Sequence, residues 1–291
     1  MDKAEATKKV VREVMNVDPS VELRVERVTG GITNKLFSCD WGAELDHNKV
    51  LVRWFGAEGM IDREVENRAF AWLANSGIAP SLKGLFDGGR IEGWLYGFRP
   101  LELDEMPLVS HGVARAMAQL HTLPTHDSDL AARFGPAASV SLWDDMQSWF
   151  DQASSLERGA ACATACAGGS SSADASAAGL AAAGGPAKML TSAERATYAA
   201  FDFARFARRI ARLKEEVLAE HASDASATAF CHNDLLCNNI MVKRDGAGRL
   251  EVRLIDFEYG GPNYCAFDIA NHVNEWAGAL ILILILILIL I

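Results

Sequence analysis

Five polar side chains interrupt an apolar run in the stretch CHNDLLCNNI, residues 231–240: His232, Asn233, Asp234, Asn238 and Asn239. Burying this many polar groups close together is costly unless each finds a partner. Asp234 and Asn239 have the spacing of a catalytic loop in which a carboxylate orients a hydroxyl and an amide oxygen binds a metal ion. The stretch therefore indicates magnesium-assisted phosphoryl transfer to a hydroxyl.

A second carboxylate, Asp256 in RLIDFEYGG, follows 22 residues after Asp234. The residues between them are predicted to form a hairpin of two strands around an Asp-Gly turn, which brings Asp256 back beside Asp234. We predict Asp234, Asn239 and Asp256 as catalytic residues, with Asn239 and Asp256 as the metal ligands. Asn238 and Asn239 are neighbours at the entrance of a strand, so only one of them should face the metal.

The segment TGGITNK, residues 29–35, lies between two expected strands and is the candidate phosphate loop. Its first two glycines leave the backbone amides open to phosphate oxygens. The loop residues predicted to bind ATP are Gly30, Gly31, Ile32, Thr33 and Asn34.

Arg53 in KVLVRWF shares a strand face with Leu51 and Phe55, so its charge needs an anion. Glu66 lies on the apolar stripe of the helix predicted over 61–74. We predict that Arg53 and Glu66 form an ion pair that holds the nucleotide phosphates. The alternative is that both residues lie on the surface.

Strand patterns dominate the first hundred residues, at 21–28, 35–41, 49–55, 79–89 and 94–101. From there to about residue 221 the spacing is helical, as in the stripe Val113, Met117, Leu120 and His121, where we expect a core histidine with its hydrogen bonds satisfied. The pattern predicts an α+β, bilobal, protein-kinase-like fold. A small β-rich N-lobe with the phosphate loop spans 1–100, and a larger helical C-lobe with the catalytic loop spans 101–278.

The net charge of −10 over 291 residues argues against a nucleic-acid partner. The amphipathic start has no signal-peptide core, and the six cysteines form no CxxC pair, which favours reduced thiols in the cytoplasm. Residues 158–187 are almost all small, and we interpret them as a flexible low-complexity insertion. The Leu/Ile tract at 279–291 is too short for a membrane-spanning helix, and we interpret it as a sequence artefact without function.

The stretches GGITNKLF, VLVRWFG, CHNDLLCNNI and LIDFEYGGPNYCAFDIANHVNEWAG resemble the choline/ethanolamine kinase family, and its ethanolamine branch most. The similarity covers about residues 20–125 and 228–278. It implies ATP-dependent phosphorylation of ethanolamine to phosphoethanolamine, the first step of the CDP-ethanolamine route to phosphatidylethanolamine, with Mg2+ and ATP. The hinge at 96–101, including Phe98 and Arg99, would bind adenine, and Glu275, Tyr259 and Trp276 would line the amine pocket.

We expect Asp268, Asn271 and His272 to brace the helix that carries the amine pocket rather than to touch the substrate. Family members continue beyond residue 278 with residues that close this pocket, so we interpret the C-lobe as truncated. Two alternatives stay open: a choline kinase or an aminoglycoside-type phosphotransferase, and a truncated, non-catalytic nucleotide-binding chain. The expected partners are ethanolamine or choline and ATP, with no nucleic acid, no stable membrane insertion and a homodimer as an open alternative.

Overall fold

The computed structural model describes most of both lobes. The described residues are 2–29, 34–41, 48–56, 63–124, 128–134, 140, 142–148, 150, 151, 153, 154, 196, 200–221 and 227–275. The insertion expected at 158–187 and the Leu/Ile tract at 279–291 lie outside these residues. No helix among the described residues is long and apolar enough to cross a membrane.

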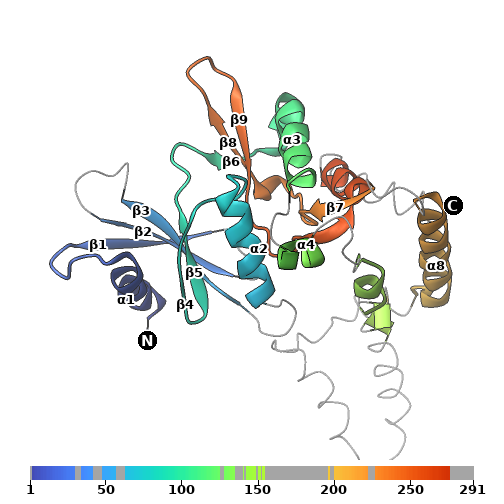
Figure 1. Cartoon of the computed structure of the whole chain (residues 1–291), viewed down its shortest axis with the longest axis horizontal. Helices are drawn as coiled ribbons and strands as arrows, with labels where there is room; N and C mark the ends of the chain where they lie inside the picture. Colours follow the sequence, from blue (N-terminus) through green and yellow to red (C-terminus); the bar gives the residue numbers. More distant parts are fainter. Residues whose placement is uncertain are drawn as a thin grey trace, which may run out of the picture.

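The N-terminal lobe is built on a five-stranded antiparallel sheet in the order β1-β2-β3-β5-β4. Its strands are β1 (Leu23–Val28), β2 (Lys35–Trp41), β3 (Lys49–Trp54), β4 (Leu82–Phe86) and β5 (Gly89–Gly93). Helix α1 (Lys3–Met15) begins at Asp2, whose side chain accepts from the Ala4 amide, and packs beside β1 and β4 (Figure 1). Helix α2 (Arg63–Asn75) buries Glu66 on the same stripe as Phe70 and Leu73, as its spacing predicts.

The chain leaves this sheet earlier than the apolar pattern at 94–101 indicates. Strand β5 ends at Gly93, and a turn follows in which Gly97 has φ +77°, a value that favours glycine. The next two residues, β6 (Arg99–Pro100), pair with a strand of the other lobe. The apolar pattern wrongly indicated a strand of the N-lobe sheet, because a short segment that connects two sheets can be as apolar as a strand within one sheet.

The C-terminal lobe combines helices with two small sheets. Its helices include α3 (Met106–His121), α4 (Ser128–Phe134), α8 (Phe203–Glu220) and a helix over 265–275, with 3-10 turns at Leu103–Glu105 and Cys237–Asn239. Residues 142–148 are helical as well. One sheet pairs β7 (Thr228–Cys231) with β10 (Gly261–Tyr264), and the other orders β6-β8-β9, with β8 at Ile240–Arg244 and β9 at Leu250–Leu254. Val113, Met117 and Leu120 of α3 are buried, as predicted.

The hairpin of β8 and β9 projects beside α3 and returns the chain to its starting point (Figure 1). Ile240 pairs with Leu254, and the Ile255 amide donates to the Asn239 carbonyl oxygen at 3.0 Å. Asp256 therefore follows directly on a residue anchored to the end of the catalytic loop. The two-lobe α+β architecture is thus confirmed, while the limits proposed for the lobes stay a prediction.

Candidate active site

The predicted catalytic loop leaves β7 at Cys231 and passes through Asn233, which has a φ of +65°. Asn239 Nδ2 donates to both the backbone oxygen and the Oδ2 of Asp234, each at 2.9 Å. Asn239 is buried and Asn238 is exposed, so the two side chains do face opposite ways. The alternation arises within a 3-10 turn, Cys237–Asn239, and not at a strand entrance as predicted.

The carboxyl group of Asp234 lies among other acids. Burial raises its pKa, and the carboxylates of Asp256 and Glu258 raise it further, while His232 and the hydrogen bond from Asn239 oppose the shift. Such an environment disfavours the free carboxylate until a cation or a donor arrives. It suits a group that accepts a proton from a bound hydroxyl.

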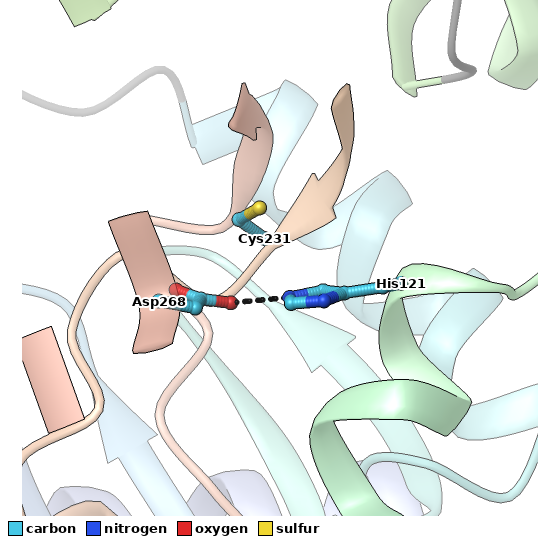
Figure 2. Close-up of side chains that lie close together, drawn as sticks. All are labelled: His121, Cys231 and Asp268. Atoms are coloured by element: carbon cyan, nitrogen blue, oxygen red, sulfur yellow. Dashed lines mark hydrogen bonds and ion pairs between the residues drawn. The ribbon is translucent and has the colours of Figure 1, made fainter. Parts of the chain in front are cut away.

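Asp268 holds the catalytic loop in place from the helix over 265–275. Its two oxygens accept from the backbone amides of His232 and Asn233, both at 2.8 Å. His121 of α3 approaches Oδ2 at 2.9 Å, so the expected satisfied core histidine is confirmed (Figure 2). Asn271 of the same helix accepts from the Leu235 amide. These side chains fix the backbone of the loop, which is more than the bracing of the helix expected of them.

His121, Cys231 and Asp268 also place three potential metal-ligand atoms within 4.8 Å of one another (Figure 2). The Asp268 oxygens are taken by the three donors named above. The Cys231 thiol contacts the backbone oxygens of Asn263 and Tyr264, and burial raises its pKa, which keeps it protonated. The group therefore serves as a structural junction between α3, β7 and the last helix.

Asp256 connects the two lobes through Arg53. It adopts φ +65°, unusual for a residue with a side chain, and its Oδ1 accepts from Arg53 Nη1 at 2.8 Å. Arg53 is buried, as its place on β3 predicts, and its Nε donates to Glu92 Oε1 at 2.8 Å. Burial disfavours the guanidinium charge, but Glu92 and Asp256 outweigh it and raise the pKa of Arg53.

The structure corrects the pairing predicted between Arg53 and Glu66. Glu66 accepts instead from Arg90 Nη1 at 2.7 Å and from Arg63 Nη1 at 2.6 Å. Arg90 and Glu92, both buried on β5, were missed by the sequence reasoning. The signal was the alternation in GRIEG, which sets two charged residues on one face of an apolar strand.

Of the five loop residues predicted to bind ATP, Asn34 is the one among the described residues, since Gly30, Gly31, Ile32 and Thr33 lie outside them. Its Nδ2 donates to Glu258 Oε2 at 2.9 Å, and its Oδ1 accepts from the Gly56 amide at 3.2 Å. Arg63 approaches the same Glu258 oxygen at 3.7 Å. The end of the loop is thereby attached to the residue two positions beyond Asp256, an attachment that sequence spacing does not reveal.

The residues expected at the hinge are also engaged within the protein. The Tyr96 hydroxyl accepts from the Lys49 amide at 2.8 Å, and the Lys243 ammonium lies 5.6 Å from the Phe98 ring centre. Arg99 forms two hydrogen bonds with Glu105, at 2.6 and 2.7 Å. Adenine binding at 96–101 stays a prediction.

Tyr259 and Glu275, two of the residues expected at the amine pocket, border different cavities. Tyr259 borders a cavity of about 380 Å3 together with Asn233 of the catalytic loop. Glu275 borders another, of about 570 Å3, beside Arg99 and Cys237. Trp276 lies outside the described residues. The substrate roles of Tyr259, Glu275 and Trp276 stay a prediction.

The oxygen atoms at this site suit a magnesium ion. Asn239 uses its amide nitrogen toward Asp234, which leaves its Oδ1 available, and Asp256 uses one carboxylate oxygen toward Arg53, which leaves the other available within the described part of the chain. Carboxylate and amide oxygens are the ligands that Mg2+ prefers. The residues present therefore fit the ion.

The sequence is similar to known kinases over most of its length. The family model described as choline/ethanolamine kinase matches residues 25–281. Ethanolamine kinase 2 from Rattus norvegicus is 31% identical over 93% of the chain and 58% of its own length. A probable choline kinase 3 from Arabidopsis thaliana is 27% identical over 90% of the chain and 62% of its own length. The chain thus spans less than two thirds of the length of these relatives.

A solved structure shares the fold. The Plasmodium vivax ethanolamine kinase superposes with a TM-score of 0.66, at 24% identity, over 94% of this chain and 66% of that one. The resemblance confirms the kinase-like arrangement of the two lobes.

Proposed function

Because this chain belongs to the choline/ethanolamine kinase family, we propose that it transfers the γ-phosphoryl group of ATP to the hydroxyl of ethanolamine. One observation supports this most strongly. Asn239 holds Asp234 at 2.9 Å, while Arg53 holds Asp256 at 2.8 Å, so a base, two oxygen ligands for a cation and a phosphate-binding cation are gathered in one place. Phosphoryl transfer needs these groups positioned and little more.

Asp234 orients the acceptor hydroxyl and takes its proton as the bond to phosphorus forms. Its raised pKa makes it a better acceptor than an exposed aspartate. Asn239 and Asp256 would hold Mg2+, which neutralises phosphate charge when it is bound. Arg53 pairs with the phosphates through the end of its guanidinium that now contacts Asp256.

The acceptor is a small alcohol that carries a cation. Asp234, Asp256 and Glu258 make the surroundings of the catalytic loop acidic. The pKa of Tyr259 is raised mainly by burial, and the charges of these three carboxylates raise it further. A protonated primary amine offers three N–H donors to such groups, whereas a quaternary ammonium offers none. This supports ethanolamine over choline. The relatives named for choline make choline the second candidate.

The test is ADP release by the purified chain with MgATP, offered ethanolamine, choline or an aminoglycoside in turn. We expect turnover with ethanolamine at a higher kcat/KM than with choline, and loss of turnover in Asp234→Asn. Preference for choline would overturn the proposed substrate. MgATP binding by folded protein without turnover on any acceptor would overturn the proposed reaction and support a non-catalytic chain.

A further inference from the structure

Two buried arginines face each other on neighbouring strands of the N-lobe sheet. Arg53 of β3 and Arg90 of β5 are direct partners in the strand register, and both side chains are at most 3% exposed. Like charges at opposed positions repel, and the repulsion is strongest where water is excluded. The arrangement therefore needs an anion between the two guanidinium groups.

Glu92 is that anion. Its Oε1 accepts from the Nε of Arg53 and from the Nε of Arg90, each at 2.8 Å. Burial alone would raise the pKa of Glu92, but the two arginines outweigh it and lower the pKa, so the residue is ionised. Because Arg53 donates its Nε–H to Glu92, the Nη1 group at the outer end of its guanidinium is directed to Asp256.

Arg90 is held from several sides. Its Nη1 donates to Glu66 at 2.7 Å, and its guanidinium lies 4.0 Å from the Phe70 ring centre and 5.6 Å from that of Phe55. Its Nη2 has no hydrogen-bond acceptor among the described residues, and the aromatic faces are its neighbours. The side chain of Arg90 is 0% exposed, and its hydrogen bonds go to other side chains, so we assign it an action through them.

We propose that Arg90 and Glu92 are positioning residues, which hold the Arg53 guanidinium in the orientation that binds the phosphates of the nucleotide. The proposal rests on the proposed function only in that Arg53 binds phosphate. Glu66 of α2 is connected to Arg53 through Arg90 and Glu92 and not by a direct pair. Arg90 thus couples the position of α2 to the phosphate-binding arginine.

The more informative variant is Arg90→Met. Glu92→Gln would leave the two arginines opposed without a full anion and so threatens the fold. Arg90→Met removes one arginine, keeps an apolar side chain against Phe70, and leaves Glu66 paired with Arg63 and Glu92 paired with Arg53. The lobe is therefore expected to fold.

The measurement is the affinity of purified protein for MgADP and for adenosine. We expect Arg90→Met to weaken MgADP binding about tenfold, the usual effect of one lost charged hydrogen bond, and to leave adenosine binding unchanged. Arg53→Met should cause at least the same loss, and the double variant should lose no more than Arg53→Met alone, because Arg90 acts through Arg53. A purely structural role would weaken adenosine and MgADP binding alike.

The matched control is Asp40→Asn, which breaks an ion pair with Arg24 in the same sheet but away from Arg53, and which should leave both affinities unchanged. Unchanged MgADP binding in folded Arg90→Met, equal weakening of both ligands, or additive losses in the double variant would each overturn the proposal. If Arg90→Met does not fold, Arg90→Lys is measured in the same way, and failure of both to fold also rejects a positioning role. MgADP binding needs no acceptor, so a failure of amine phosphorylation is recognised separately.

Discussion

The carboxyl group of Asp234 is held by a hydrogen bond from Asn239, but its surroundings disfavour a negative charge. It lies near Asp256 and Glu258, and burial with these neighbours raises its pKa. The raised pKa means that the folded protein binds this proton more tightly than the unfolded chain. Ionising Asp234 therefore costs the folded protein stability. This cost is absent at a pH below the ordinary pKa of aspartate, and it reaches its full size once the pH has risen above the raised pKa. At neutral pH the residue therefore lowers the free energy of unfolding.

Asp234→Asn should stabilise the ligand-free protein while it abolishes turnover. We expect a gain of about 1 kcal/mol at pH 7, or a rise in Tm of about 3 °C for a domain of this size. The gain should shrink as the pH falls through the raised pKa toward the ordinary one, because the wild-type residue then becomes neutral too. Thermal unfolding across this range checks the sign, and a variant less stable than the wild type at pH 7 would contradict it.

Asp268 shows the opposite balance, because each of its oxygens has a donor. Asp268→Asn replaces one oxygen with an NH2 group, which leaves a backbone amide of the catalytic loop without its acceptor. We expect a loss of about 2–3 kcal/mol in the free energy of unfolding, measured by urea titration, together with a lower kcat.

The comparison variant for Asp268 is His121→Gln, which removes a side-chain partner of Asp268 and leaves both backbone amides bonded. Its loss of stability should be clearly smaller. Equal losses would show that the contact with α3 matters more than support of the loop.

The β8–β9 hairpin is the element that brings the two halves of the site together. It rests on α3, where a Cβ built at Gly112 would lie 2.6 Å from Val252 Cγ2. Val252 is β-branched, so its methyl groups move little. The glycine therefore lets the helix approach the strand whose end leads to Asp256.

Gly112→Ala should destabilise the protein despite alanine's better helix propensity. The gain of about 1 kcal/mol from propensity is opposed by an overlap that costs about 1–3 kcal/mol. We expect a net loss in the free energy of unfolding by urea titration. Adding Val252→Ala removes the overlap, so Gly112→Ala should then be neutral or stabilising. The same loss in both backgrounds would exclude this close approach as the cause.

Across the whole molecule, the two lobes share a hydrophobic core, in which Trp72 of α2 packs against Phe134 and Phe230. They also meet through polar contacts, at the site and away from it. Arg53 binds Asp256, and Asn34 binds Glu258, both within the site. Arg253 of β9 donates to the Gly77 backbone oxygen at 2.9 Å, outside the site and largely in solvent. Breaking a buried contact of this kind costs more than breaking an exposed one, because it leaves a polar group buried without its partner.

Asn34→Asp tests the buried contact between the lobes. The new carboxylate would face the Glu258 carboxylate at a buried position, so we expect a loss of about 2 kcal/mol in the free energy of unfolding and weaker MgADP binding. Acid should relieve the defect, because two facing carboxyl groups share a proton more readily as the pH falls.

Arg253→Met is the comparison for the exposed contact between the lobes. It should change stability by less than about 1 kcal/mol and leave MgADP binding unaltered. Both variants are measured by thermal unfolding and nucleotide titration. Similar effects of the two would contradict the view that the buried contacts couple the lobes.

Residue spacing and periodicity predict the parts of this site that are close along the chain. The spacing of Asp234 and Asn239 predicted two side chains that do meet, and the hairpin length predicted that Asp256 returns beside them. The stripe of α2 also predicted a buried Glu66. These inferences hold because chain connectivity and helix or strand periodicity fix local geometry with few alternatives.

Which groups meet when they are far apart in the sequence depends on how the strands and lobes pack. Periodicity showed that Arg53 and Glu66 face inward, but Arg90 and Glu92 arrive from another strand, whose register places Arg90 opposite Arg53. Likewise, Tyr259 and Glu275 open on different cavities, although resemblance placed them together. The physical reason is that several buried charges can satisfy one another in more than one way, and the packing of sheets and lobes selects the pairing.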